Sequence, residues 1–284
     1  MNFNPFSLNI SGKLIKYDTP AVMGIVNVTP DSFYGGSRTF NGDAVKTRVE
    51  KLISDGADML DIGAYSSRPG ADDVSPAEEL RRIEMGMEEI RRIAPEIPVS
   101  IDTFRADVAR TAVQDLSVNI INDISGGDLD DKMFETVAML NVPYILMHMR
   151  GTPSTMQQLT DYGETGVTAE VLRDLAVKVN KLALLGVNDI IVDPGFGFSK
   201  TLDQNYELLA HLDAFRALEC PVLVGVSRKS MITKYLNINS EEALNGTTVI
   251  NVLALLHGCE ILRVHDVKPA VEAVKLCCKT YSSL

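Results

Sequence analysis

The sequence predicts an α/β fold of the (β/α)8 TIM barrel class, and three observations lead to this prediction. Eight short apolar runs recur along the 284 residues without strict polar alternation, as is typical of strands buried on both faces of a parallel sheet. Each run is followed by a segment long enough for a helix. No GxGxxG turn follows the first run, which disfavours a doubly wound open sheet, the alternative with the same alternation.

The predicted elements follow one another in a regular order. A hairpin extension in residues 1–20 would pair SLNI with KLIKY across Ser11-Gly12 and cap the barrel floor. The eight predicted strands are AVMGIVN to Asn27, DMLD to Asp61, VSID to Asp102, VNIIND to Asp123, PYILMH to His148, DIIVD to Asp193, PVLVGVS to Ser227 and EILRVH to His265. Apolar spacing predicts helices over 43–54, 76–93, 106–114, 131–140, 168–185, 203–217, 240–256 and 267–278. Residues 1–284 are expected to form a single domain.

Composition limits the classes of function. A net charge of −11 and a sequence pI near 4.9 disfavour a nucleic-acid partner, because phosphate backbones attract clustered basic residues. No apolar run reaches the roughly 20 residues that span a bilayer, and the N-terminus lacks a basic start with an apolar core. We therefore expect a cytoplasmic protein with no membrane partner. Cys220, Cys259, Cys277 and Cys278 lack CxxC spacing, which predicts free thiols.

Polar residues at the strand ends are the candidate site, since barrels carry function at the C-terminal ends of their strands. Asp102, Asn122 and Asp193 each close or nearly close an apolar run. Each could be a satisfied structural group, but three around one mouth favour a ligand with a row of donors, such as the N–H edge of a pyrimidine or pterin. Lys229 could supply the complementary donor, or could belong to a solvated basic loop.

Two residues of the last strand suggest an anion site. Arg263 and His265 are two positions apart, so their side chains share one face. The following helix would add its free N–H groups where barrels often hold phosphate. A structural Arg and a core His are the alternative interpretation. The loops after the first two strands, rich in Gly, Pro and Ser, suggest mobile lids.

Seven motifs then identify a resemblance. NVTPDSF at 27–33, DIG with SRPGA within 61–71, SIDT at 100–103, IINDISGG at 120–127, DPGFGF at 193–198, GVSRKS at 225–230 and RVHD at 263–266 resemble the dihydropteroate synthase family from about residue 20 to 270. The family has the (β/α)8 barrel fold and joins 4-aminobenzoate to 6-hydroxymethyl-7,8-dihydropterin diphosphate in folate synthesis, releasing pyrophosphate. One motif departs: GAYSSRPGA stands where the family commonly has GGESTRPGA, so Tyr65 replaces an acidic residue and Ser67 a Thr.

The resemblance implies a role for each site residue. The expected catalytic residues are Asp31, Arg68, Lys229, Arg263 and His265. The pterin pocket would be Asp102, Asn122, Met147, Asp193, Gly225 and Lys229. The diphosphate would contact Asn27, Ser67, Arg68, Arg263 and His265, with Mg2+ as cofactor at Asn27. The aminobenzoate would contact Phe33, Ser67, Arg68, Pro69, Phe198 and Ser230. The family also implies a homodimer and a sulfonamide target.

Two alternatives share the pterin pocket. The pterin-binding barrel of corrinoid-dependent methyltransferases needs no diphosphate site, so SRKS, SRPG and RVHD favour the synthase. A catalytically inactive pterin-binding relative is suggested only by Tyr65. Release of pyrophosphate from the two substrates would separate the three.

Overall fold

The chain is a parallel eight-stranded barrel surrounded by helices, as the sequence predicts. The computed structural model describes residues 3–29, 42–65 and 74–281. The barrel strands are β3 (Ala21–Asn27), β4 (Met59–Gly63), β5 (Val99–Asp102), β6 (Ile120–Asp123), β7 (Tyr144–Met147), β8 (Ile190–Asp193), β9 (Leu223–Val224) and β10 (Ile261–Val264). Their order is β8-β7-β6-β5-β4-β3-β10-β9, and a parallel bridge between Val192 and Val222 closes the ring.

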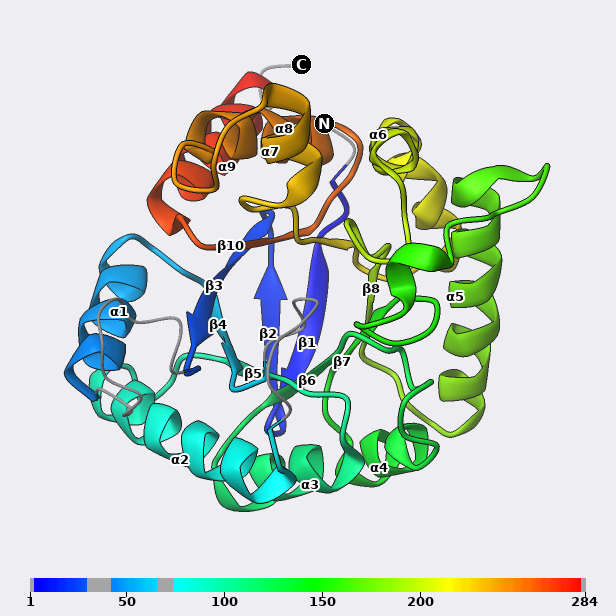
Figure 1. Ribbon diagram of the computed structural model, residues 1–284. Coiled ribbons are helices and arrows are strands. Elements are labelled where there is room, and N and C mark those ends of the chain that lie inside the picture. Colours follow the sequence, from blue (N-terminus) through cyan, green and yellow to red (C-terminus); the bar gives the residue numbers. More distant parts are fainter. Residues whose placement is uncertain (1–2, 30–41, 66–73, 282–284) are drawn as a thin grey trace.

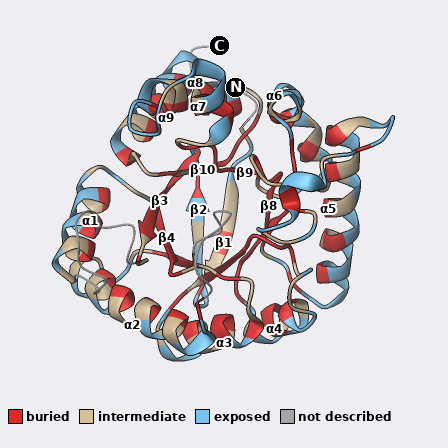
Figure 2. Ribbon diagram, in the orientation of Figure 1, coloured by how far each residue is buried: buried red, intermediate tan, exposed pale blue. Residues whose placement is uncertain are grey.

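The helices form the outer layer seen around the strands in Figure 1. They are α1 (Gly42–Ser54), α2 (Pro76–Ile93), α3 (Ala106–Asp115), α4 (Met133–Leu140), α5 (Gly166–Leu184), α6 (Leu202–Ala210), α7 (Ser230–Leu236), α8 (Leu244–Leu256) and α9 (Val267–Tyr281), with 3-10 turns η2 (Met156–Gln158) and η3 (Leu212–Leu218). Buried residues concentrate in the strands and on the helix faces that cover them (Figure 2). In the described part of the chain no helix is long and apolar enough to cross a membrane.

The N-terminal hairpin closes the floor of the barrel, as predicted. Strands β1 (Phe6–Ile10) and β2 (Lys13–Tyr17) pair antiparallel. Leu8, Ile10 and Tyr17 pack in one apolar cluster with inward-facing residues at the N-terminal ends of the barrel strands. These are Ala21, Met23, Met59, Ile120, Ile145, Ile191, Leu223 and Ile261. The hairpin therefore keeps water out of that end and leaves the C-terminal ends of the strands as the open mouth.

Two predicted helices differ from the structure. The helix predicted over 203–217 ends at Ala210 and continues as η3. Leu209, Leu212 and Phe215 are buried at three-residue spacing, which suits the three residues per turn of a 3-10 helix. Helix α8 begins at Leu244 rather than Ser240, because Asn239 Oδ1 accepts the N–H groups of residues 241 and 242 and shapes a turn there.

The seventh strand and the segment after it also differ. Only Leu223–Val224 of the predicted 221–227 run forms a strand. Beyond it the chain turns, with Lys229 N–H donating to the Val226 carbonyl. The short helix α7 then begins at Ser230, in a segment where no helix was predicted. The four cysteines are free thiols, as predicted.

Candidate active site

The mouth of the barrel is lined by the inward-facing row directly above the apolar floor. Side chains alternate along a strand, so Met59 and Asp61 face inward while Leu60 and Ile62 pack against the helices. Register places Asp102 beside Gly63 and Asn122, and Met147 beside Asp193. The inward row above the floor thus consists of Asp61, Asp102, Asn122, Met147, Asp193, Gly225 and Arg263. All but Asp61 were predicted site residues.

Arg263 is held between two carboxylates. Its Nε donates to Asp61 Oδ2 at 2.6 Å, and its Nη2 lies 2.5 Å from Asp61 Oδ2 and 2.9 Å from Asp102 Oδ2. Burial alone would lower the pKa of Arg263, but Asp61 and Asp102 raise it above its ordinary value. Burial raises the pKa of Asp102 to about 7, and Arg263 opposes that rise. The guanidinium is therefore positively charged and balances the negative charge of the carboxylates on this side of the mouth.

Asp61 is the residue around which this group is organised. Its side chain is fully buried, and its Oδ2 accepts from Asn122 Nδ2 at 3.2 Å as well as from Arg263. Asp61 Oδ1 is buried without a hydrogen-bond partner among the described residues. Asp61 thus binds two predicted site residues, Asn122 and Arg263, that lie 61 and 202 positions away from it along the chain, so the fold and not the local sequence brings them together.

Asp193 lies across the mouth from this group. Its Oδ1 accepts from the Gly195 N–H at 2.7 Å. Burial raises the pKa of Asp193, while the charges of Lys229 and Arg263 lower it. A Cβ on Gly225 would lie 3.9 Å from Arg263 and 4.0 Å from Asp193 Oδ2. The lack of a side chain at Gly225 keeps the space between these two residues open.

Lys229 lies in the loop after β9, and its side chain approaches the space between Asp193 and Arg263. Its Nζ donates to the Phe196 carbonyl at 2.6 Å and lies 4.7 Å from the centre of the Phe198 ring. Burial lowers the pKa of Lys229 to about 8, and Asp193 opposes that effect. Lys229 is therefore an ammonium group at neutral pH, directed at the pocket rather than into solvent.

An apolar wall faces these polar groups. Ile124, Met147, Met149 and Met156 form a buried cluster, against which Phe104, Leu129 and Phe198 pack. The cluster begins where β6 and β7 end. Carboxylates and an amide on one side with methionine and aromatic side chains on the other suit a flat heteroaromatic ring with polar edges. Of the wall, the sequence predicted only Met147 and Phe198.

The rim above this pocket holds the predicted anion-binding residues. His265 Nδ1 lies 3.0 Å from Ser227 Oγ, and burial lowers the pKa of His265 to about 4. The imidazole is therefore neutral at pH 7. Arg228 bonds both oxygens of Asp266 at 2.8 and 3.0 Å, which ties the seventh loop to the eighth. Asn27 ends β3, beside Gly63, with its side chain partly exposed.

The residues predicted to contact aminobenzoate are described only in part. Phe198 packs against the apolar wall, and Ser230 is an exposed residue at the start of α7. Asp31, Phe33, Ser67, Arg68 and Pro69 lie outside the described residues. Tyr65 is described: its ring meets that of Phe104 edge-on at 5.2 Å, and the Arg105 guanidinium lies 5.4 Å from its centre. The base of the second loop is thereby packed against the loop after β5.

Sequence reasoning missed two buried charges, Asp61 and Lys200. Asp61 ends a predicted strand, which was a usable signal. Lys200 closes the DPGFGF motif region, and its Nζ is buried beside His148 Nδ1 at 3.1 Å. Burial lowers the pKa of Lys200 to about 7 and that of His148 to about 2.

Comparison with known proteins agrees with this geometry. Residues 23–265 match the family described as pterin binding enzyme. Dihydropteroate synthase of Escherichia coli K12 is 41% identical over 275 residues, which cover 96% of this chain and 95% of that protein. The structure of Xanthomonas albilineans dihydropteroate synthase with 4-aminobenzoic acid superimposes with a TM-score of 0.89, at 36% identity, over 99% of this chain and 100% of that one. The Yersinia pestis enzyme in a sulfonamide drug complex also gives 0.89, at 36% identity, over 98% and 100%.

Proposed function

The chain belongs to the dihydropteroate synthases of the pterin binding enzyme family, and from that membership we propose how its own residues carry out the reaction. It is a transferase of folate biosynthesis. The reaction joins 4-aminobenzoate to 6-hydroxymethyl-7,8-dihydropterin diphosphate and gives 7,8-dihydropteroate and pyrophosphate. We place this reaction in the cytoplasm.

The inward row of the mouth is the proposed pterin pocket. Asp193 would accept hydrogen bonds from the polar edge of the ring, and Asn122 would donate one to it. Lys229 would donate to a ring nitrogen or carbonyl oxygen. Met147 and Gly225 would bound the ring on its flat faces. The observation that supports this most strongly is the facing arrangement of Asp193 and Lys229 against the apolar wall. A carboxylate accepts two neighbouring N–H donors together, which an aminopyrimidine edge provides.

Asp102 has two tasks in this proposal. It already binds Arg263 through Oδ2, so its other oxygen is the one offered to the pterin. Because Asp102 would bind both Arg263 and the pterin, it would hold the Arg263 guanidinium between the pterin ring and the diphosphate. Arg263 would then contact the leaving group through Nη1, since Nε and Nη2 donate to Asp61 and Asp102.

The diphosphate would lie along the rim. His265, a neutral imidazole held by Ser227, would donate one hydrogen bond to a phosphate oxygen, and the N–H groups at the start of α9 would add to the attraction. Ser67 and Arg68 are proposed to complete this site from the second loop.

A magnesium ion fits the donor set at this rim. No group of three His, Cys, Asp or Glu that could hold a metal occurs among the described residues. Mg2+ usually takes one or two protein oxygens together with substrate phosphates and water, and the Asn27 amide oxygen is such a ligand. When bound, magnesium supplies positive charge that stabilises the leaving diphosphate.

Catalysis in this proposal is mainly electrostatic. The amine nitrogen of aminobenzoate forms a bond to the pterin methylene carbon, the carbon–oxygen bond to the diphosphate breaks, and the nitrogen loses a proton. An arylamine is already neutral, so departure of the diphosphate is the main barrier. Arg263 and His265 stabilise charge on the leaving group, while Asp193 and Asp102 stabilise the cationic ring. Asp31 and Arg68 are proposed to assist from the first two loops.

The aminobenzoate is proposed to bind above the pterin. Phe198 and Ser230 would form one side of its pocket, and Phe33, Ser67, Arg68 and Pro69 the other. Sulfonamides that mimic aminobenzoate would compete for the same place. The pocket is then complete only when the first two loops contribute to it.

A pyrophosphate-release assay tests the proposed function. The two substrates together should release pyrophosphate and yield 7,8-dihydropteroate, and omission of aminobenzoate should stop the release. Pterin binding without release would indicate an inactive relative. Methyl transfer from a methylated pterin to a corrinoid would indicate the methyltransferase function instead.

We also propose a homodimer that uses the face formed by α7, α8 and α9. A groove of about 860 Å³ runs between α8 and α9 and is lined mostly by apolar atoms. Seven of the exposed large apolar side chains lie on or beside these helices: Tyr235, Leu236, Leu244, Val249, Leu253, Leu276 and Tyr281. Clustered exposed apolar residues are typical of a protein interface.

Sedimentation equilibrium tests the dimer. Leu276, 70% exposed in the groove, should be replaced by Glu, with Leu184→Glu on α5 as a control at 81% exposure. We expect the Leu276 variant alone to dissociate, because only it places a charge in the interface. A monomeric parent, or dissociation by both variants, would contradict this face.

A further inference from the structure

The loop after β8, residues 193–200 and called here the β8 loop, is folded around a single buried lysine. Lys200 is 3% exposed. Its Nζ donates to the carbonyls of Gly195 at 2.9 Å and Phe198 at 3.0 Å, and lies 3.1 Å from His148 Nδ1. Among the described residues no carboxylate forms an ion pair with Lys200. The ammonium group is thus satisfied by the loop itself and by the neighbouring strand end.

The path of the β8 loop needs such a support. Gly195, Gly197 and Ser199 have φ of 73°, 83° and 47°, and a left-handed conformation costs energy for a residue with a side chain. A Cβ on Gly195 would lie 2.0 Å from the His148 carbonyl oxygen, so the loop runs directly against the end of β7. The two carbonyl acceptors and the neighbouring His148 ring nitrogen around one Nζ hold this path together.

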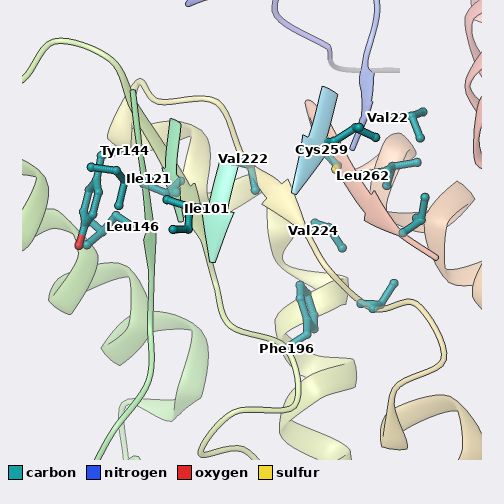
Figure 3. Close-up of a cluster of buried hydrophobic side chains, with 14 of the residues drawn as sticks. Val22, Ile101, Ile121, Tyr144, Leu146, Phe196, Val222, Val224, Cys259 and Leu262 are labelled. Atoms are coloured by element: carbon teal, nitrogen blue, oxygen red, sulfur yellow. The ribbon is translucent and has the colours of Figure 1, made fainter. Parts of the chain in front are cut away.

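The Phe196 side chain anchors the loop from the other side. It is fully buried in the cluster between the strands and the helices, where Figure 3 shows it below Val224. The side chain of residue 196 therefore points into the core, while its carbonyl faces the mouth and accepts from Lys229.

Both polar ends of the proposed pterin pocket are attached to this loop. The Gly195 N–H holds Asp193 Oδ1, and the Phe196 carbonyl holds Lys229 Nζ. The carbonyls that Lys200 binds belong to Gly195 and Phe198, on either side of Phe196. A shift of this four-residue stretch, 195–198, would move the two pocket groups relative to each other.

From this geometry we propose that Lys200 is a positioning residue, which sets the spacing of Asp193 and Lys229 for the pterin without touching the substrate. The proposal rests on the proposed function, because it assigns those two residues to the pterin pocket. Lys200 acts through the backbone of the β8 loop, so its loss should weaken pterin binding more than it lowers turnover at saturating pterin.

A matched control separates positioning from general stabilisation. Lys178 on α5 is 6% exposed, and its Nζ lies 2.8 Å from Asp128 and 3.3 Å from Asp174. It is a buried lysine with no contact to the β8 loop. Lys200→Met and Lys178→Met remove the same group from equally buried places, and both are expected to lower the free energy of unfolding.

The experiment measures two quantities for the parent and both variants. Titration with 6-hydroxymethyl-7,8-dihydropterin diphosphate, without aminobenzoate, gives the affinity. Hydrogen exchange of the peptide that contains residues 193–200 in the ligand-free protein gives the order of the loop. We expect Lys200→Met to weaken binding roughly 10- to 100-fold, the range for loss of a group that orients a ligand-binding residue, and to speed exchange in that peptide. Lys178→Met should change neither.

Each outcome decides one of the two proposals. Unchanged affinity and exchange in Lys200→Met, or equal losses in both variants, would overturn the positioning role. If Lys200→Met does not fold, the same test is made with Lys200→Gln, which keeps N–H donors without the charge and should bind the pterin diphosphate more weakly than the parent and exchange faster in the 193–200 peptide. If the parent itself binds no pterin diphosphate, the proposed function fails, while the exchange measurement still decides whether Lys200 holds the loop.

Discussion

Replacing Asp61 by Asn should destabilise the protein through Arg263. The substitution preserves the shape of a fully buried side chain but removes the charge that pairs with the guanidinium. Removal of one partner from a buried ion pair costs about 3–5 kcal/mol. Arg263 retains Asp102 at 2.9 Å, and an amide oxygen at position 61 can still accept one hydrogen bond. We therefore expect a loss at or just below the lower limit of that range, about 2–3 kcal/mol.

A double-mutant cycle with Arg263→Met measures this pair directly. Urea unfolding at neutral pH gives the free energy of unfolding of the parent, both single variants and the double variant. If Asp61 acts through Arg263, Asp61→Asn should cost far less in the Arg263→Met background, with a coupling of about 2 kcal/mol. A coupling near zero, with the full cost retained in that background, would refute the account of Asp61.

Variants at four further positions test separate parts of the site. The parent should lose pterin affinity above about pH 8, since burial lowers the pKa of Lys229 to about 8 and only the charged form donates from all three hydrogens. Lys229→Met should not show that loss; an alkaline limb that survives in the variant would assign the loss elsewhere. Burial lowers the pKa of His265 from its ordinary 6.5 to about 4. Its neutral imidazole therefore contributes stability that is fully present above pH 6.5 and is lost as the pH falls toward 4. Between pH 7 and pH 5 the free energy of unfolding, measured in urea, should therefore fall by about 1–2 kcal/mol less in His265→Gln than in the parent. Equal falls would count against a neutral imidazole. Tyr65→Ala should cost about 1–2 kcal/mol by the same method, because the ring contacts to Phe104 and Arg105 are lost, whereas Tyr65→Phe should cost little; a similar cost for both would point to the hydroxyl. Asn27→Ala should weaken magnesium pyrophosphate binding in titration more than it weakens binding of a pterin without diphosphate, and equal effects would remove Asn27 from the metal site.

The barrel could be predicted from the sequence because its strands and helices leave local patterns. Most predicted strands end within two residues of the observed ones, since an apolar run stops where the chain leaves the barrel. The helix over 76–93 is correct to the residue: Ser75 caps it and Pro76 begins it, which are local signals. Spacing alone could not distinguish α6 from η3, because Leu209, Leu212 and Phe215 at intervals of three fit both kinds of helix.

The contacts within the site could be predicted only in part. Asp102 and Asp193 end strands and Asn122 lies one residue before the end of β6, so the topology alone brings them to one mouth. The contact of Arg263 with Asp61 joins positions 202 residues apart, and it depends on strand register that no local pattern encodes. The sequence therefore predicted most of the residues that line the mouth, but not Asp61 and not that Arg263 is shared between two carboxylates.

Lys200 shows a second reason for incomplete prediction. A lysine after a glycine-rich loop is usually solvated, and its burial follows from the positive φ angles of Gly195 and Gly197, which turn the loop back over it. Those angles are permitted by glycine but not required by it.

Titration of a pterin into the parent and the Asp193→Asn variant tests the central claim most directly, namely that the inward row of the barrel mouth is the pterin pocket. The substitution keeps the shape of the side chain but presents N–H donors where the ring presents its own. The account predicts a loss of roughly 2–4 kcal/mol in binding free energy for the variant, with the free energy of unfolding measured alongside. Unchanged affinity in a folded variant would contradict the account, because Asp193 would then lie outside the pocket.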